Sequence, residues 1–295
     1  MKFTRKKIIL AFSMFLGSMA LYAGDLVLEK SYFIDSKKNL EPSGLTIKNG
    51  NFYFISDDED KKIYKLVFSG ESCKAETSHK LEFDIKPPKA LNYEGINAAD
   101  DGYYYLLSEP EYRVVKVSEN GKAVLGESFL NDGRKAGFFK GKAKGPEGMI
   151  VYKGGEKILI ASQGDKGKLL EGDIINGKVV NFKTIKIISE DISEGKENNN
   201  WISDLYLYKD RIYVLLKKAN KIVELKRNGD TYEETGVFSY DKAISLKKYS
   251  YLKGNDFGEG LAVDDKHFYV IFDNNKDGRL ENLSDERPLF IILKR

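Results

Sequence analysis

The sequence contains very few of the residues that carry nucleophilic, redox or soft-metal chemistry. It has one cysteine, Cys73, and two histidines, His79 and His267, among 295 residues. A single cysteine forms no internal disulfide, so the stability of the fold must come from its core. Two histidines offer little for a histidine-rich metal site or a Ser-His-Asp triad. G-x-S-x-G, P-loop and C-x-x-C motifs are absent as well. These enzyme classes are therefore largely excluded.

A long apolar run occurs only near the N-terminus, from Ile8 to Ala20. It follows four basic residues and is short for a membrane span. We predict that residues 1–23 are a signal peptide cleaved after Ala23, with an uncleaved anchor as the alternative. No cysteine follows the run, which argues against lipoprotein processing. Residues 24–295 are predicted to form a single exported domain, periplasmic or secreted, without a further membrane span.

The charge of the expected mature chain is balanced. The full chain has 48 basic and 45 acidic residues. Four basic residues and no acidic ones lie in the predicted leader, which leaves 44 against 45 and a net charge of −1. Evenly mixed charge without a basic stripe does not favour nucleic-acid binding.

One short motif recurs at nearly constant spacing along the chain. Each copy has Ser or Glu, then Gly or Asp, then an aliphatic residue, and the Ser or Glu positions are 51, 53, 56 and 56 residues apart. The copies read EPSGLT (41–46), NYEGIN (92–97), GPEGMI (145–150), WISDLY (201–206) and FGEGLA (257–262).

Each motif is followed by a Gly- or Asp-containing turn, a β-branched and aromatic strand, a polar loop and a third alternating strand. Repeats of this kind, without a helical period, predict an all-β fold. About 54 residues per repeat fits a five-bladed β-propeller, whereas a double sandwich does not explain five equal units. We predict that the strand after the leader, from Leu26, completes the last blade and closes the ring. Longer loops at 126–144, 189–200 and 241–256 are expected to join successive blades.

The first strand of each propeller blade lines the axis, so the five motif side chains should meet at one mouth of the channel. Close carboxylates repel unless they are protonated or neutralised. An all-oxygen set without His or Cys favours Ca²⁺ over zinc or copper. Hydrogen-bonded residues without a metal are the alternative. The predicted Ca²⁺ ligands are Ser43, Glu94, Glu147, Ser203 and Glu259.

A second tier of polar residues ends the second strand of each repeat and should surround the same mouth. It consists of Asp57, Asp58, Glu109, Gln163, Lys217, Asp273 and Asn274. Ordinary loop polarity is the alternative for any one of them.

Two further features at the mouth, the segment 273–278 and the aromatic residues Tyr93 and Trp201, each allow two interpretations. DNNKDG at 273–278 begins like a calcium loop, so Asp273, Asn275 and Asp277 are candidates for a second, weaker site, with a solvated turn as the other interpretation. Tyr93 and Trp201 precede motif residues and either stack on a ligand or pack between blades.

At PSGL (42–45), YEGI (93–96), PEGM (146–149), ISDL (202–205), EGLA (259–262) and FDNN (272–275), the chain resembles the phytase-like propellers named for an esterase-like activity of phytase. Propellers of the SdiA-regulated type share similar motifs. The order Ser, Glu, Glu, Ser, Glu is also similar to the axial calcium ring of calcium-activated nucleotidases. That resemblance implies calcium ligation by the five motif residues. Nucleotidases of that kind carry Asp-Asp-Arg on the first blade. The matching stretch from Ser56 to Glu59 lacks the Arg, which argues against nucleotide hydrolysis.

Two functions follow from these patterns. The first is a calcium-dependent phosphoester hydrolase acting on a small anionic or phosphorylated ligand, in which Asp57 or Glu109 activates water and Lys217 holds negative charge. The second is a non-catalytic propeller in which calcium joins the blades and the polar mouth binds a ligand or a protein.

Overall fold

Alternating apolar and polar segments form strands through most of the described chain. The computed structural model describes residues 22–295 except 38–39, 141–144, 166, 193–200 and 255–256. The all-β prediction is confirmed. The predicted leader lies outside the described residues, apart from Tyr22 and Ala23 in β1 (Tyr22–Asp25), which pairs in parallel with β19 (Thr231–Ser239). No helix of the described residues has the length and apolar character needed to cross a membrane.

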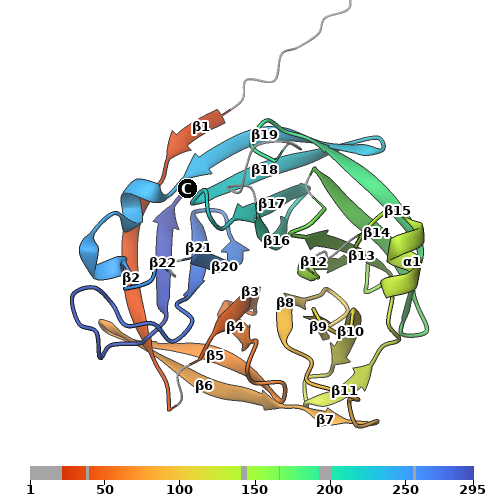
Figure 1. Cartoon of the computed structure of the whole chain (residues 1–295), viewed down its shortest axis with the longest axis horizontal. Helices are drawn as coiled ribbons and strands as arrows, with labels where there is room; N and C mark the ends of the chain where they lie inside the picture. Colours follow the sequence, from red (N-terminus) through yellow and green to blue (C-terminus); the bar gives the residue numbers. More distant parts are fainter. Residues whose placement is uncertain (1–21, 38–39, 141–144, 166, 193–200, 255–256) are drawn as a thin grey trace, which may run out of the picture.

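The strands form four-stranded antiparallel meanders arranged around a common centre (Figure 1). The meanders that are continuous in sequence are β3 (Pro42–Lys48), β4 (Asn51–Ser56), β5 (Lys62–Ser69) and β6 (Ser72–Lys80); β8 (Tyr93–Ala98), β9 (Tyr104–Ser108), β10 (Arg113–Val117) and β11 (Lys122–Leu125); β12 (Pro146–Tyr152), β13 (Lys157–Ser162), β14 (Lys168–Ile175) and β15 (Lys178–Ile188); and β16 (Ile202–Tyr208), β17 (Arg211–Leu216), β18 (Lys221–Asn228) and β19.

The remaining meander joins the two ends of the chain. Its strands are β20 (Phe257–Val263), β21 (His267–Asp273), β22 (Leu289–Lys294) and β2 (Val27–Asp35), in that order. β2 pairs antiparallel with β22 from Val27↔Lys294 to Phe33↔Leu289. The predicted pairing of the N-terminal strand with the last repeat is therefore confirmed. A further short strand, β7 (Glu82–Phe83), pairs in parallel with β11.

The sequence predicted no helix, but the described parts of the loops between meanders contain three short helices. They are α1 (Leu130–Lys135) and the 3₁₀ helices η1 (Asp241–Ile244) and η2 (Lys247–Tyr249). α1 is six residues long, which is too short to produce an apolar stripe at helical period. Its position depends on tertiary packing, because Phe138 and Phe139 beside it are fully buried.

The apolar cores lie between neighbouring meanders. One cluster joins Leu215 of β17 to Leu261 of β20, and another joins Phe54 of β4 to Ile271 of β21. Strands from adjacent meanders therefore bury apolar surface against one another, which gives each repeat a neighbour on both sides.

The innermost strands approach each other so closely that little room is left for a Cβ at the second motif position of four copies, where glycine stands. The remaining copy has Asp204 at this position. A Cβ on Gly148 would lie 2.7 Å from the Cα of Asp204, and one on Gly260 would lie 2.7 Å from the backbone of Gly44. A Cβ on Gly44 would lie 3.0 Å from the backbone of Ile96, and one on Gly95 would lie 2.9 Å from the backbone of Glu147. The inner contacts run β3–β8–β12–β16–β20 and back to β3. The recurrent glycine of the motif is thus explained by backbone contact around the centre.

The Gly260→Ala variant should lower the free energy of unfolding by about 1–3 kcal/mol, because its Cβ would collide with backbone that cannot move independently. Urea unfolding followed by circular dichroism measures the change. Gly172→Ala is the matched control, since its nearest neighbours are the ends of the Phe182 and Val179 side chains, at 3.0 Å. Equal losses in the two variants would contradict the close-contact explanation.

Candidate functional site

Each of the motif residues lies at an irregularity at the start of an inner strand. The pairing register shifts between Pro42 and Gly44, and an equivalent shift surrounds each of the other motif positions. Such β-bulges turn a side chain away from the regular alternation and are frequent beside functional sites. The residues at these shifts are Ser43, Glu94, Glu147, Ser203 and Glu259. The sequence predicted the strand starts but not the bulges.

The carboxylates of this set influence one another strongly. Burial is the main cause that raises the pKa of Glu94 well above its usual value, and Glu147 and Glu259 raise it further. Burial likewise raises the pKa of Glu147 to about 8, with Glu259 and Glu109 adding to the effect and Lys217 opposing it. Charged carboxylates at this place are therefore unfavourable without additional positive charge.

The two motif serines keep their oxygen atoms available as acceptors. Ser203 Oγ donates to the carbonyl of Gly258 at 2.8 Å, and Ser43 Oγ donates to the carbonyl of Glu41 at 3.2 Å. Both side chains are buried, with 1% and 5% of their surface exposed. Because each hydroxyl hydrogen is directed to a carbonyl, the lone pairs of the oxygen remain free.

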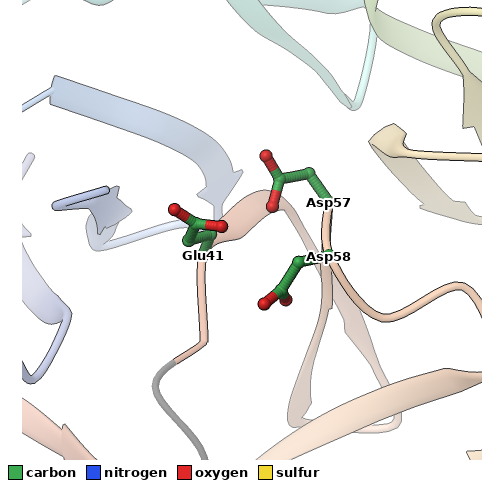
Figure 2. Close-up of side chains that lie close together, drawn as sticks. All are labelled: Glu41, Asp57 and Asp58. Atoms are coloured by element: carbon green, nitrogen blue, oxygen red, sulfur yellow. The ribbon is translucent and has the colours of Figure 1, made fainter. Parts of the chain in front are cut away.

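An acidic cluster forms beside the motif residues of the first meander (Figure 2). Carboxylate oxygens of Glu41, Asp57 and Asp58 all lie within 4.8 Å of one another, and in the described part of the chain this is the one such group of three His, Cys, Asp or Glu residues. The backbone N–H of Asp57 donates to the carbonyl of Glu41 at 3.1 Å, and Ser56 Oγ donates to Asp58 at 2.6 Å. The first bond joins the start of β3 to the end of β4, and the second orders the turn after β4.

The environment of Asp57 brings the pKa of its carboxyl group close to neutral pH. Burial, with Glu41 and Asp58 contributing, raises the pKa of Asp57 to about 7. Among the described residues, its buried Oδ1 atom has no hydrogen-bond partner. A carboxyl group of this kind exchanges protons readily near pH 7, and its Oδ1 atom is available to accept a hydrogen bond.

Sequence reasoning missed one cation at this cluster, Lys276, in the loop between β21 and β22. Its Nζ lies 3.0 Å from Glu41 Oε2 and 3.0 Å from Asp58 Oδ2, and its side chain is 43% exposed. The residue directly after the Asp pair of the first repeat is Glu59, not a basic residue, and Lys276 brings a positive charge from the opposite end of the chain. The segment DNNKDG (273–278) contains this lysine, but no local pattern in the sequence connects Lys276 to residues 41–58.

Other second-tier residues also act on the motif carboxylates. Glu109 contributes to the raised pKa of Glu94 and accepts a hydrogen bond from the backbone of Gly145 at 3.0 Å. Gln163, which is 7% exposed, donates to Glu147, and its own Oε1 is a buried atom without a partner among the described residues. Burial raises the pKa of Asp273 to about 8, and Glu259 adds to it.

Lys217 is placed directly against a motif residue. Its Nζ lies 2.6 Å from Glu259 Oε1, and the two side chains are 12% and 11% exposed. Burial opposes the charge of Lys217, but Glu259, Glu147 and Glu94 outweigh it and raise its pKa. Lys217 is thus a counter-ion within the carboxylate group.

The remaining predicted features have mainly local partners. In the 273–278 segment, Asp273 accepts the N–H of Asn275 at 2.7 Å, and Asp277 accepts the N–H of Lys253. Tyr93 is fully buried in the core between β4 and β9, which agrees with packing and not with stacking on a ligand. Trp201 is partly exposed, and the Lys218 ammonium lies 3.7 Å from its ring centroid.

Four-stranded meanders arranged around a common centre define a propeller-type protein. The chain belongs to the phytase-like family, described by an esterase-like activity of phytase, whose model matches residues 41–284.

One solved structure of TM-score above 0.5 agrees with this fold. A glutaminyl cyclase from Myxococcus xanthus is similar at a TM-score of 0.54 and 12% identity, over 92% of this chain and 97% of that one. A gluconolactonase from Xanthomonas campestris has a TM-score of 0.48 and 6% identity, over 85% and 72%. At these identities the likeness concerns the fold alone. No curated protein matches the chain in sequence.

Proposed function

We propose that the meanders are the five blades of a closed β-propeller, formed by residues 24–295 after removal of an exported leader. Two observations support this arrangement: the circular order of inner-strand contacts and the β2–β22 pairing. The basic residues before the apolar run from Ile8 support export to the periplasm or the exterior.

We further propose that the axial group holds Ca²⁺ through Ser43, Glu94, Glu147, Ser203 and Glu259. The donor set fits a hard cation, because every donor is oxygen and both serine hydroxyls retain acceptor lone pairs. The raised pKa values of Glu94 and Glu147 indicate a deficit of positive charge that a divalent ion would remove. Gln163 Oε1, buried beside Glu147 without a partner among the described residues, is a further oxygen at this place.

The activity that the site supports best is hydrolysis of a small phosphorylated compound at the mouth. The observation that carries it is Asp57, whose pKa of about 7 suits a general base at neutral pH. When bound, calcium would supply Lewis-acid polarisation of a phosphoryl oxygen. Asp57 would remove a proton from water, and Glu109, held by the backbone of Gly145, would orient it. Lys217 contributes positive charge behind the carboxylates. Lys276 is more exposed and better placed to meet an anionic group.

Calcium added to EDTA-treated mature protein should raise its melting temperature by about 5–10 °C. A ligand at 100 times its Kd stabilises the native state by ~2.7 kcal/mol, and each kcal/mol corresponds to ~2–4 °C in a domain of this size. Differential scanning calorimetry measures the shift. No shift with calcium would contradict the axial ion.

Phosphate release from a panel of small esters tests the catalytic role. Asp57→Asn should lower turnover by about 10²–10⁴-fold, as expected for loss of a general base, and Glu109→Gln should lower it less. Asp132→Asn, on exposed α1, is the control and should retain full activity. A melting shift without turnover would leave the second function, a calcium-joined propeller that binds a ligand or protein.

A further inference from the structure

Lys217 is attached firmly between two blades. It follows β17, and its backbone N–H donates to the carbonyl of Trp201 at 3.0 Å, which ties it to the start of β16. Its side chain then reaches β20, where Nζ pairs with Glu259 Oε1 at 2.6 Å. The ring of Phe257 lies 6.0 Å from the same ammonium. The cation is therefore part of the wall of the axial site and not a mobile surface charge.

The ammonium contacts Glu259, one of the carboxylates that are proposed to hold calcium. Glu259, Glu147 and Glu94 all stabilise its charged form. With its side chain 12% exposed, Lys217 is shielded from solvent, so its attraction to these groups is not strongly screened. A divalent cation placed among these carboxylates would be repelled by the ammonium and would share Glu259 with it.

We propose that Lys217 is a built-in competitor that sets the cation affinity of the axial site. The inference rests on the proposed calcium function and deepens it. In the metal-free protein Lys217 neutralises part of the carboxylate charge and keeps the inner strands together. Calcium binding requires the ammonium to give up Glu259, so a full set of ligands forms only when free calcium is abundant, as it is outside the cytoplasm.

Lys217 and its neighbour Lys218 should differ in their effect on calcium affinity, because the ammonium of Lys218 lies over the ring of Trp201. Lys217→Met removes the charge and keeps much of the apolar stem, so it should bind calcium about tenfold or more tightly than the wild type, equivalent to ~1.4 kcal/mol or more. Lys217→Arg keeps the positive charge and should stay near the wild-type affinity. Lys218→Met is the matched control and should leave the affinity unchanged.

Isothermal titration of EDTA-treated mature protein with calcium chloride distinguishes the outcomes. Tighter binding by Lys217→Met alone supports the proposal. Equal or weaker binding overturns it and leaves the calcium function standing. Binding by Lys217→Met without binding by the wild type supports the competitor role but removes the calcium function of the natural chain. No binding by either protein overturns both.

A measurement on the wild type alone covers the case in which Lys217→Met does not fold. Amine acylation with and without calcium, read by peptide mass spectrometry, should label Lys217 several-fold more when calcium displaces its ammonium from Glu259. Lys218 should be labelled equally in both conditions. Unchanged labelling of Lys217 under calcium concentrations that shift the melting temperature would overturn the proposal.

Discussion

Replacing Asp204 by alanine should lower the free energy of unfolding by about 3–5 kcal/mol, because two or more buried backbone N–H groups lose their acceptor. Asp204 occupies the motif position where the other copies have glycine, and it is fully buried. Its carboxylate accepts the N–H of Leu205 and that of Leu261, each at 2.8 Å. The second bond crosses from β16 to β20 and so joins two inner strands.

Urea unfolding monitored by circular dichroism measures this loss. Asp204→Asn keeps one acceptor oxygen but turns an amide NH₂ toward the remaining donor, so it should fall between the wild type and the alanine variant. Asp210→Ala, in an exposed turn with a side chain that is 75% exposed, is the control and should change stability by less than about 0.5 kcal/mol. An alanine variant as stable as the control would mean that other acceptors satisfy these backbone groups.

In calcium-free buffer the protein should lose stability as the pH rises from about 5 to 8, by roughly 3–4 kcal/mol for each of two buried carboxyl groups. The pKa of Glu147 rises from 4.5 to about 8 on folding, and that of Asp273 rises from 3.8 to about 8. Between these values the native state holds protons that the unfolded chain has released. Rising pH therefore favours unfolding, and the stabilising contribution is complete only below about pH 4.

Denaturation curves in EDTA at several pH values measure the slope of the unfolding free energy against pH. Glu147→Gln should flatten it, because the amide does not titrate. Glu127→Gln, whose side chain is 67% exposed, should leave it unchanged. Calcium at pH 8 should restore much of the lost stability if the axial site binds it. A stability that is constant from pH 5 to 8 would show that these carboxylates are solvated or already neutralised.

Local sequence determined the strands, and it did so for a simple physical reason. Alternation of apolar and polar residues fixes which face of a strand is buried. The segments FYFIS, KILIAS and RIYVLL accordingly lie in β4, β13 and β17. The repeated Gly after Ser or Glu was also visible, because a close backbone contact recurs at four of the motif copies, and only the copy with Asp204 departs from it. Family membership follows from the same motifs.

The composition of the site was only partly visible from the sequence. The motif residues and the second-tier residues were predicted from their equivalent positions in the repeats, and their roles stay predictions. Glu41 and Lys276 were not predicted as site residues, because what singles them out is the ion pair between them. The two are 235 residues apart and meet only where the last meander lies against the first. Nor does any local pattern specify that Lys217, which follows β17, reaches Glu259 of β20.

The sequence by itself determined the all-β class, the repeats and the family, since these depend on short-range alternation and on backbone contacts that recur along the chain. The tertiary structure alone decided which charges meet, which carboxyl groups are shifted toward neutral pH and whether Tyr93 packs or is exposed. Charge pairing and desolvation depend on distances between side chains from different meanders, and those distances exist only after the first and last strands have paired.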